Sequence, residues 1–326
     1  GQQTHDAVRL DHKHDNMTFS AAWIMNSEGG TPGNNATAGT DRDVETYMAY
    51  MKYAGVLGGN LSITYAGIID PCGNNGVVCT DDGNINDMHT IGFRQAGQLY
   101  GIDYRGEYYY QWGDANQDGN ATSLVGGVAD GTGLERDAYM FGVRIGKTFK
   151  NVTMKPSLTV WYDYLSGTDD QDLAATDAKW KSFNPVFDTG HKFYGLQDLF
   201  LGIGTGNATN GTGGLGLQDL AIKTKLSPAP GWTFKMDYHW FYTAEGTAAN
   251  SQRGFSGNSD VATQPNRNGG NDLGTEIDLS LANKYNANTT ITAGFSNYSN
   301  TQIFRDIRNV DSGGANWAYL MFDVKF

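Results

Sequence analysis

The sequence lacks long apolar runs. Only 39% of its 326 residues are hydrophobic and the mean hydropathy is −0.47. No stretch approaches the roughly 18 apolar residues of a transmembrane helix. The chain begins without a basic segment followed by an apolar one, so we expect a mature form whose secretion signal has been removed. Walker, dinucleotide-binding and haem-attachment motifs are also missing, which leaves a nucleotide or haem function without support.

Cysteine is scarce. Cys72 and Cys79 are the only two, and they lie close together in a segment rich in Gly and Asn. A metal site would need more ligands nearby, whereas this spacing suits a small loop disulfide in an oxidising compartment. We expect the disulfide to pin the loop and to take no part in chemistry.

A catalytic constellation is missing too. His239 lies two residues from Asp237 on one face of a predicted strand. A nucleophilic triad would also need a Ser within reach, and no Gly-x-Ser-x-Gly nucleophile elbow is present. We therefore predict no catalytic residues and no enzyme, and we interpret His239 as a polar side chain of the interior.

Strict alternation is what the sequence does contain. In the last nine residues one set is apolar and the other is mixed and charged: Ala318, Leu320, Phe322, Val324 and Phe326 against Tyr319, Met321, Asp323 and Lys325. Side chains alternate across a strand, so this is a strand with one apolar and one polar face. Its aromatic last residue resembles the C-terminal signature of bacterial outer-membrane β-barrels.

The pattern recurs in runs of about ten residues, the length that a tilted strand needs to cross a bilayer. It is found in residues 102–112, 156–164, 232–243 and 273–281, with Leu273, Ile277, Leu279 and Leu281 as the apolar set of the last. Tyr and Trp at the ends suit the headgroup level. A soluble sandwich also has alternating strands, but these are usually shorter. We predict an all-β, antiparallel up-and-down transmembrane β-barrel with apolar residues towards lipid.

Short and long connections alternate along the chain, as in outer-membrane barrels with short periplasmic turns and long outside loops. Counting through them gives about thirteen strands in a single domain of residues 1–326. An odd count contradicts the even number expected of bacterial barrels, so either the count is wrong or N-terminal strands are missing, and we expect the latter. The longest connection, residues 166–214, is rich in aromatic residues, and we expect it to fold over or into the pore.

Three stretches resemble the alginate-export family of outer-membrane porins. They are residues 91–113, residues 162–167 and residues 183–198, the last with the core His191-Lys-Phe-Tyr-Gly195. The resemblance extends from about residue 88 onward. It implies a monomeric barrel of roughly eighteen strands in the bacterial outer membrane. An exporter of alginate would need a dense basic belt to match a carboxylate on every sugar.

The inward-facing sets are mixed instead, with basic residues slightly ahead of acidic ones. Because the formal net charge of the chain is −12, the acidic excess is expected in the loops. The predicted pore-lining residues are Arg94, Arg105, Arg144, Lys155, Lys223, Lys225, Lys235, Asp103, Glu107, Asp237, His239 and Glu276. Opposite charges in a barrel often just pair across strands, which is the alternative to a selective constriction.

One connection resembles the opening of a calcium loop. Asp114, Asn116, Asp118 and Asn120 follow the pattern D-x-N-x-D-G, but Val125 stands where the bidentate Glu is expected. This is the only cofactor that the sequence suggests.

We therefore predict an outer-membrane porin for small polar or anionic solutes or saccharides. The alternative is a structural or adhesive barrel whose lumen is plugged and whose loops bind. The expected partners are the lipid bilayer, lipopolysaccharide and a small solute or oligosaccharide, with no nucleic acid.

Overall fold

The computed structural model describes residues 6–27, 44–69, 87–115, 135–169, 172, 179–185, 193–202, 211–247, 270–308, 310 and 313–325. These residues form a single sheet, antiparallel except for one short strand, with one short helix, α3 (Gln302–Arg308), between the last two strands. No helix in this part of the chain is long and apolar enough to cross a membrane.

Thirteen of the strands form a meander in which each strand pairs with the next. They are β1 (Asp6–His14), β2 (Met17–Ser27), β3 (Val44–Val56), β4 (Gly59–Ile69), β5 (Met88–Leu99), β6 (Ile102–Asp114), β7 (Glu135–Thr148), β8 (Ser157–Leu165), β10 (Leu217–Leu226), β11 (Trp232–Thr247), β12 (Gly270–Lys284), β13 (Thr289–Asn300) and β14 (Gly314–Val324). The predicted all-β fold, its up-and-down order and the count of about thirteen strands are confirmed.

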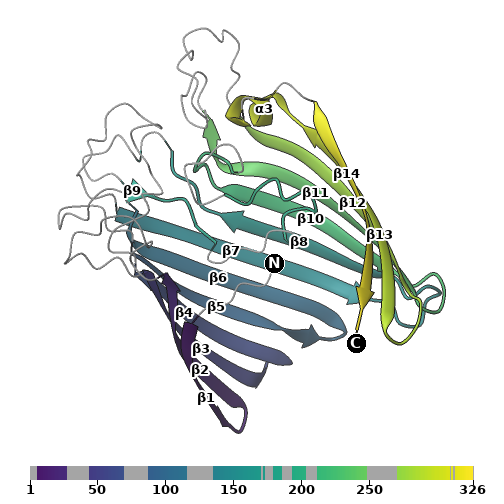
Figure 1. The fold of residues 1–326 in the computed structure, drawn as a ribbon, viewed down its shortest axis with the longest axis horizontal. Coiled ribbons are helices and arrows are strands. Elements are labelled where there is room, and N and C mark those ends of the chain that lie inside the picture. Colours follow the sequence, from purple (N-terminus) through teal and green to yellow (C-terminus); the bar gives the residue numbers. More distant parts are fainter. Residues whose placement is uncertain are drawn as a thin grey trace, which may run out of the picture.

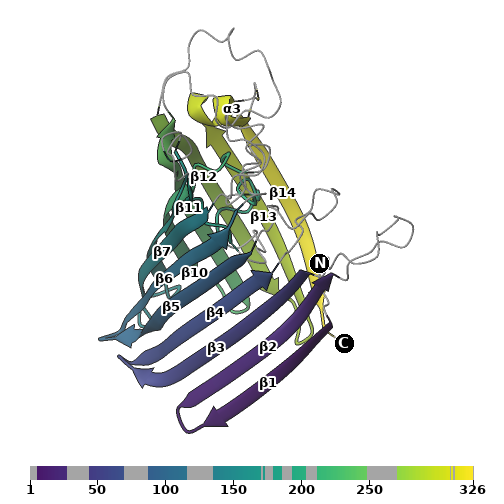
Figure 2. The same ribbon diagram turned by 90° about the vertical axis from the view of Figure 1, so that its left-hand side faces the viewer.

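The sheet curves into a trough whose two edges are β1 and β14 (Figures 1 and 2). Within the described residues β1 pairs only with β2 and β14 only with β13, so the sheet is open. A further short strand, β9 (Lys179–Trp180), pairs in parallel with the start of β7. This strand lies within the longest connection, residues 166–214.

Two-residue turns set the register of the hairpins. Leu57–Gly58 joins β3 to β4 and Tyr100–Gly101 joins β5 to β6, with positive φ at all four residues. This is the type I′ geometry, whose twist matches that of the flanking strands. The register in turn decides which side chains face each side of the sheet.

The outer face carries the apolar sets that the alternation predicted. Phe93, Val143, Val160, Leu220 and Leu320 are among its exposed side chains. Aromatic rings stack across β6, β7 and β8 on this face, with centroids 6.4 Å apart for Tyr108–Tyr139 and 5.7 Å apart for Tyr139–Tyr164. Such cross-strand aromatic pairs stabilise a sheet and suit a lipid interface.

Leu273 corrects one predicted phase. The sequence grouped it with the outward residues of β12, but the register against β11 shifts between Phe241 and Tyr242. A bulge inserts one extra residue and reverses the phase beyond it. Leu273 is consequently turned to the inner face, where it is 1% exposed within an apolar cluster.

This apolar cluster is the core of the molecule. It joins β10–β13 to α3 and to part of the long connection through the rings of Phe200, Phe241, Tyr298 and Phe304. The centroids of Phe200 and Phe241 are 4.7 Å apart. Arg308 of α3 donates hydrogen bonds to the carbonyls of Leu199 and Gly211, and burial lowers its pKa to about 10.

We expect Phe200→Ala to lower the folding stability of this cluster by about 3–5 kcal/mol, the usual cost of removing a buried ring. The loss should appear as faster amide hydrogen exchange in residues 193–202. Phe149→Ala, at a 43% exposed position beside the β7–β8 turn, is the matched control and should leave that exchange unchanged.

Candidate pore constriction

The inner face carries a belt of charged side chains from β5 to β12. Alternate residues of each strand point to this face, and the pairing brings them side by side. The members of the belt are Arg94 (β5), Arg105 and Glu107 (β6), Arg144 (β7), Asp163 (β8), Asp219 and Lys223 (β10), Asp237 and His239 (β11), and Glu276 and Asp278 (β12).

Glu107 is the centre of the first part of the belt. Nη2 of Arg105 lies 2.5 Å from one of its carboxylate oxygens, and Nη2 of Arg144 lies 3.4 Å from the other. The same Nη2 of Arg144 lies 3.2 Å from Asp163. The guanidinium of Arg144 also stacks on the ring of Trp161 at 3.2 Å from its centroid, so a planar cation–π contact fixes its orientation.

His239 is the centre of the second part. Its Nδ1 lies 2.9 Å from Asp219, and its Nε2 lies 3.1 Å from Nζ of Lys223. The two contacts fit together when Nδ1 carries the proton and Nε2 accepts from the ammonium group. Lys223 also binds Asp237 at 3.0 Å. No serine or other nucleophile takes part in the contacts that we describe for His239.

The long connection is anchored on the acidic end of the belt. The backbone N–H of Leu196 donates to Glu276 at 2.8 Å and to Asp278 at 3.2 Å, and the N–H of Gln197 donates to Glu276 at 3.1 Å. Ser296 donates to the same oxygen of Glu276 at 3.0 Å. Gly195 has φ +83°, and a Cβ there would lie 2.6 Å from the Glu276 carboxylate. Only glycine allows this close approach without strain.

A second part of the connection is anchored on β6. The side chain of Gln111 exchanges two hydrogen bonds with the backbone of Asn184, at 2.7 and 2.8 Å. The N–H of Phe183 donates to the carbonyl of Ser166 at 3.0 Å. Nearby, the hydrogen bond to Asp172 raises the pKa of Lys181. Two separate points therefore hold the described parts of residues 166–214 against the inner face.

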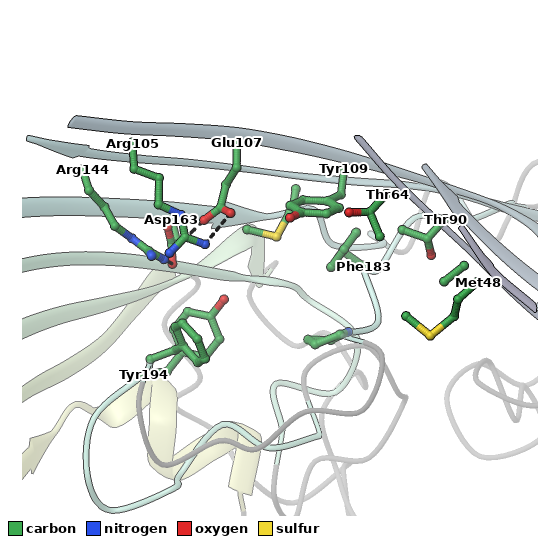
Figure 3. Close-up of a pocket in the computed structure, with 14 residues that line it drawn as sticks. Met48, Thr64, Thr90, Arg105, Glu107, Tyr109, Arg144, Asp163, Phe183 and Tyr194 are labelled. Atoms are coloured by element: carbon green, nitrogen blue, oxygen red, sulfur yellow. Dashed lines mark hydrogen bonds and ion pairs between the residues drawn. The ribbon is translucent and has the colours of Figure 1, made fainter. Parts of the chain in front are cut away.

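A pocket of about 360 Å³ remains between the connection and the sheet (Figure 3). One end is charged and is formed by Arg105, Glu107, Arg144 and Asp163. Most of the remaining lining is apolar or aromatic: Met48, Ala66, Tyr109, Met140, Phe183, Pro185, Phe193 and Tyr194. Thr64 and Thr90 complete it.

The charges of the belt differ in their access to water. The side chains of Arg94 and Arg105 are 37% and 24% exposed, whereas those of Glu107 and Asp163 are 3% and 1% exposed. Asp219 is fully buried against His239, and Glu276 is covered by residues 195–197. Asp237 is the exception, at 28%, and it is paired with Lys223. Among the members of the belt, the reachable charge on β5 and β6 is therefore basic.

Several predicted pore-lining residues lie away from the belt. Lys155 is in the turn between β7 and β8, where it is exposed and has φ +44°, so it is not on the barrel wall. Lys225 and Lys235 are paired residues of β10 and β11, and both are exposed. Asp103 is exposed next to the Tyr100–Gly101 turn and accepts a hydrogen bond from Gln98. The remaining eight predicted residues are members of the belt.

The sequence reasoning missed several residues of the site. Asp219 lies on the inward phase of β10, and its alternation with Leu220 was a usable signal. Trp161 shares the inward phase of β8 with Asp163, but the pattern gives it no role. Gly195 and the N–H groups of Leu196 and Gln197 carry no signal at the level of strand pattern.

Two predicted sites lie outside the described residues. Cys72 and Cys79 are not described, nor are Asn116, Asp118 and Asn120. Asp114 is the last residue of β6. The disulfide and the calcium loop therefore stay predictions. The described residues contain no group of three or more His, Cys, Asp or Glu side chains that could hold a metal ion.

Several solved structures are distantly similar to this chain. OccK5 (OpdH) of Pseudomonas aeruginosa is 11% identical, with a TM-score of 0.46 over 98% of this chain and 71% of that one. OccAB1 of Acinetobacter baumannii is 11% identical, with a TM-score of 0.47 over 98% and 67%. The siderophore receptor PiuA of A. baumannii is 10% identical, with a TM-score of 0.44 over 92% and 48%. No curated protein sequence matches.

The alginate export family model matches residues 2–313. The match begins far earlier than residue 88, where the sequence resemblance was expected to start. Together with the antiparallel meander of amphipathic strands, this match indicates a barrel embedded in the bilayer through which small solutes pass. The chain belongs to the alginate export family and is a porin of the bacterial outer membrane.

Proposed function

We propose that this porin conducts small polar solutes through a water-filled lumen with a modest preference for anions. The observation that carries the proposal is the uneven exposure of the belt. Its acidic side chains other than Asp237 are covered by partners or by residues 195–197, and Asp237 is paired with Lys223, while Arg94 and Arg105 remain reachable from water. A basic wall next to a low-dielectric sheet attracts anions, because the wall concentrates the field in the lumen.

The proposed solutes are small anions and short saccharides, and a long polyuronate such as alginate is less favoured. Every basic member of the belt in β6, β7 and β10 has an acidic partner within 4 Å. Such pairs cancel much of the field that would hold a polymer with one carboxylate on every sugar. Arg94 is the basic residue with the weakest ion pair, at 3.9 Å from Glu107.

We further propose that residues 166–214 narrow the lumen, that the barrel functions as a monomer, and that its outer surface contacts lipopolysaccharide. The alternative is a plugged barrel with a structural or adhesive role. The charged end of the 360 Å³ pocket favours a wet interior over a plugged one, because buried charges without water or ligand are costly.

The ion selectivity of the channel tests the proposal. We expect Arg94→Gln to lower the ratio of anion to cation permeability by about twofold, because it removes the most exposed charge of the basic wall. The ratio follows from the reversal potential across a salt gradient in a planar bilayer.

Lys155→Gln is the matched control, since it removes the same charge from a turn. It should leave the ratio unchanged. Cation preference in the unmodified protein, or an equal effect of the two substitutions, would refute a selective basic wall.

A further inference from the structure

The pocket at the belt has one polar end and one apolar end. Its charged end offers more hydrogen-bond donors than acceptors. A guanidinium carries five N–H donors. The contacts of Arg105 and Arg144 with Glu107 and Asp163 run through a single nitrogen, Nη2, in each case. Nε of each arginine is buried and has no hydrogen-bond partner among the described residues.

A buried donor without a partner is unfavourable, so this end of the pocket is suited to a ligand that supplies acceptor oxygens. Arginine presents two parallel N–H groups that match the two oxygens of a carboxylate. Both oxygens of Glu107 and Oδ2 of Asp163 are already engaged by the arginines, while Oδ1 of Asp163 is also buried without a partner. The two unpartnered Nε donors outnumber this one unpartnered acceptor. The missing acceptor is therefore expected to come from outside the protein.

The remaining lining excludes a strongly polar ligand body. Met140 and Tyr109 come from the sheet, and Phe183, Pro185 and Phe193 come from the long connection. Phe193 packs against Trp161 with ring centroids 6.1 Å apart, and the guanidinium of Arg144 lies 5.8 Å from the Phe193 ring centroid. A ligand whose carboxylate meets the arginines would thus place its body between aromatic and apolar side chains (Figure 3).

We propose that this pocket is a binding subsite for a small monocarboxylate with an apolar body, such as a single aromatic ring. The volume of about 360 Å³ is at the small end of the range of ligand pockets, roughly 300–1,000 Å³, and so suits one ring. The inference rests on the proposed channel function, because the ligand reaches the pocket from the lumen. It deepens that function by naming the class of solute that the porin retains.

Binding of three probes to the detergent-solubilised protein tests the chemistry, with isothermal titration calorimetry as the measurement. Benzoate carries both a carboxylate and an apolar ring, benzamide lacks the charge, and glucuronate lacks the apolar body. We expect benzoate to bind at least about tenfold more tightly than either of the others. Equal binding of benzamide would overturn the role of the arginines, and equal or tighter binding of glucuronate would overturn the apolar body.

A double substitution tests the position of the proposed binding subsite. Arg105→Gln with Glu107→Gln removes one charge of each sign, so no carboxylate loses its only cation, and benzoate affinity should fall at least about tenfold. Lys223→Gln with Asp237→Asn removes a similar ion pair outside the pocket and should leave the affinity unchanged. Equal losses in both variants would overturn the assignment. An unchanged circular dichroism spectrum shows that each variant is folded.

Conductance of the same preparations separates this inference from the proposed function. If the protein conducts ions but does not bind benzoate, the subsite is wrong and the channel stands. If it binds benzoate with the expected preference but forms no channel, the channel is wrong and the pocket serves a plugged barrel.

Discussion

Gly195→Ala is expected to raise single-channel conductance, because it displaces the part of the long connection that covers Glu276. The new Cβ would lie 2.6 Å from the carboxylate, and the φ of +83° costs a residue with a side chain about 1–2 kcal/mol. That energy shifts the balance between docked and released residues 195–197 by about five- to thirtyfold. Conductance in planar bilayers measures the result.

Gly246→Ala is the control for this experiment, because a Cβ at Gly246 meets no atom within 4 Å. It should leave the conductance at the value of the unmodified protein. If Gly195→Ala also conducts like the unmodified protein, residues 195–197 do not restrict the lumen.

Arg144→Gln is expected to destabilise the barrel by about 3–5 kcal/mol, because it leaves a buried carboxylate without its cation. Asp163 is 1% exposed and has Arg144 as the basic partner at 3.2 Å, while Glu107 keeps Arg105. The loss of stacking on Trp161 adds to the effect. The free energy of unfolding in urea, with the protein in lipid vesicles, is the measurement.

A second substitution distinguishes electrostatics from packing. Arg144→Gln combined with Asp163→Asn removes the unpaired carboxylate and should recover most of the lost stability. A double variant as unstable as the single one would mean that Arg144 acts through its contact with Trp161 alone.

The fold could be predicted because one simple pattern governs it. Along 156–164 and 232–243 the apolar and polar sets alternate without interruption, and each strand lies against its neighbours in the phase that this alternation requires. The pattern failed where the period is broken. The bulge beside Gly274 turns Leu273 inward, and Lys155, which was predicted to line the pore, lies in a turn just before the alternating run.

The site could be predicted only in part. Alternation assigns Arg105, Glu107 and Arg144 to the inner face. The convergence of the two arginines on the Glu107 carboxylate depends on the stagger between neighbouring strands, which the sequence of a single strand does not encode. The anchoring of residues 195–197 on Glu276 and Asp278 uses backbone N–H groups, which every residue except proline has. The glycine at 195 was the one hint, and the sequence contains 44 glycines.

The central claim is that the belt lines an open, ion-conducting lumen, and the single-channel current of the unmodified protein in a planar bilayer tests it most directly. With a salt gradient across the membrane, we predict discrete conductance steps and a reversal potential whose sign indicates anion preference, weakening as salt rises and screens the exposed arginines. A folded protein that inserts into the bilayer without producing steps would contradict the account and favour a plugged barrel.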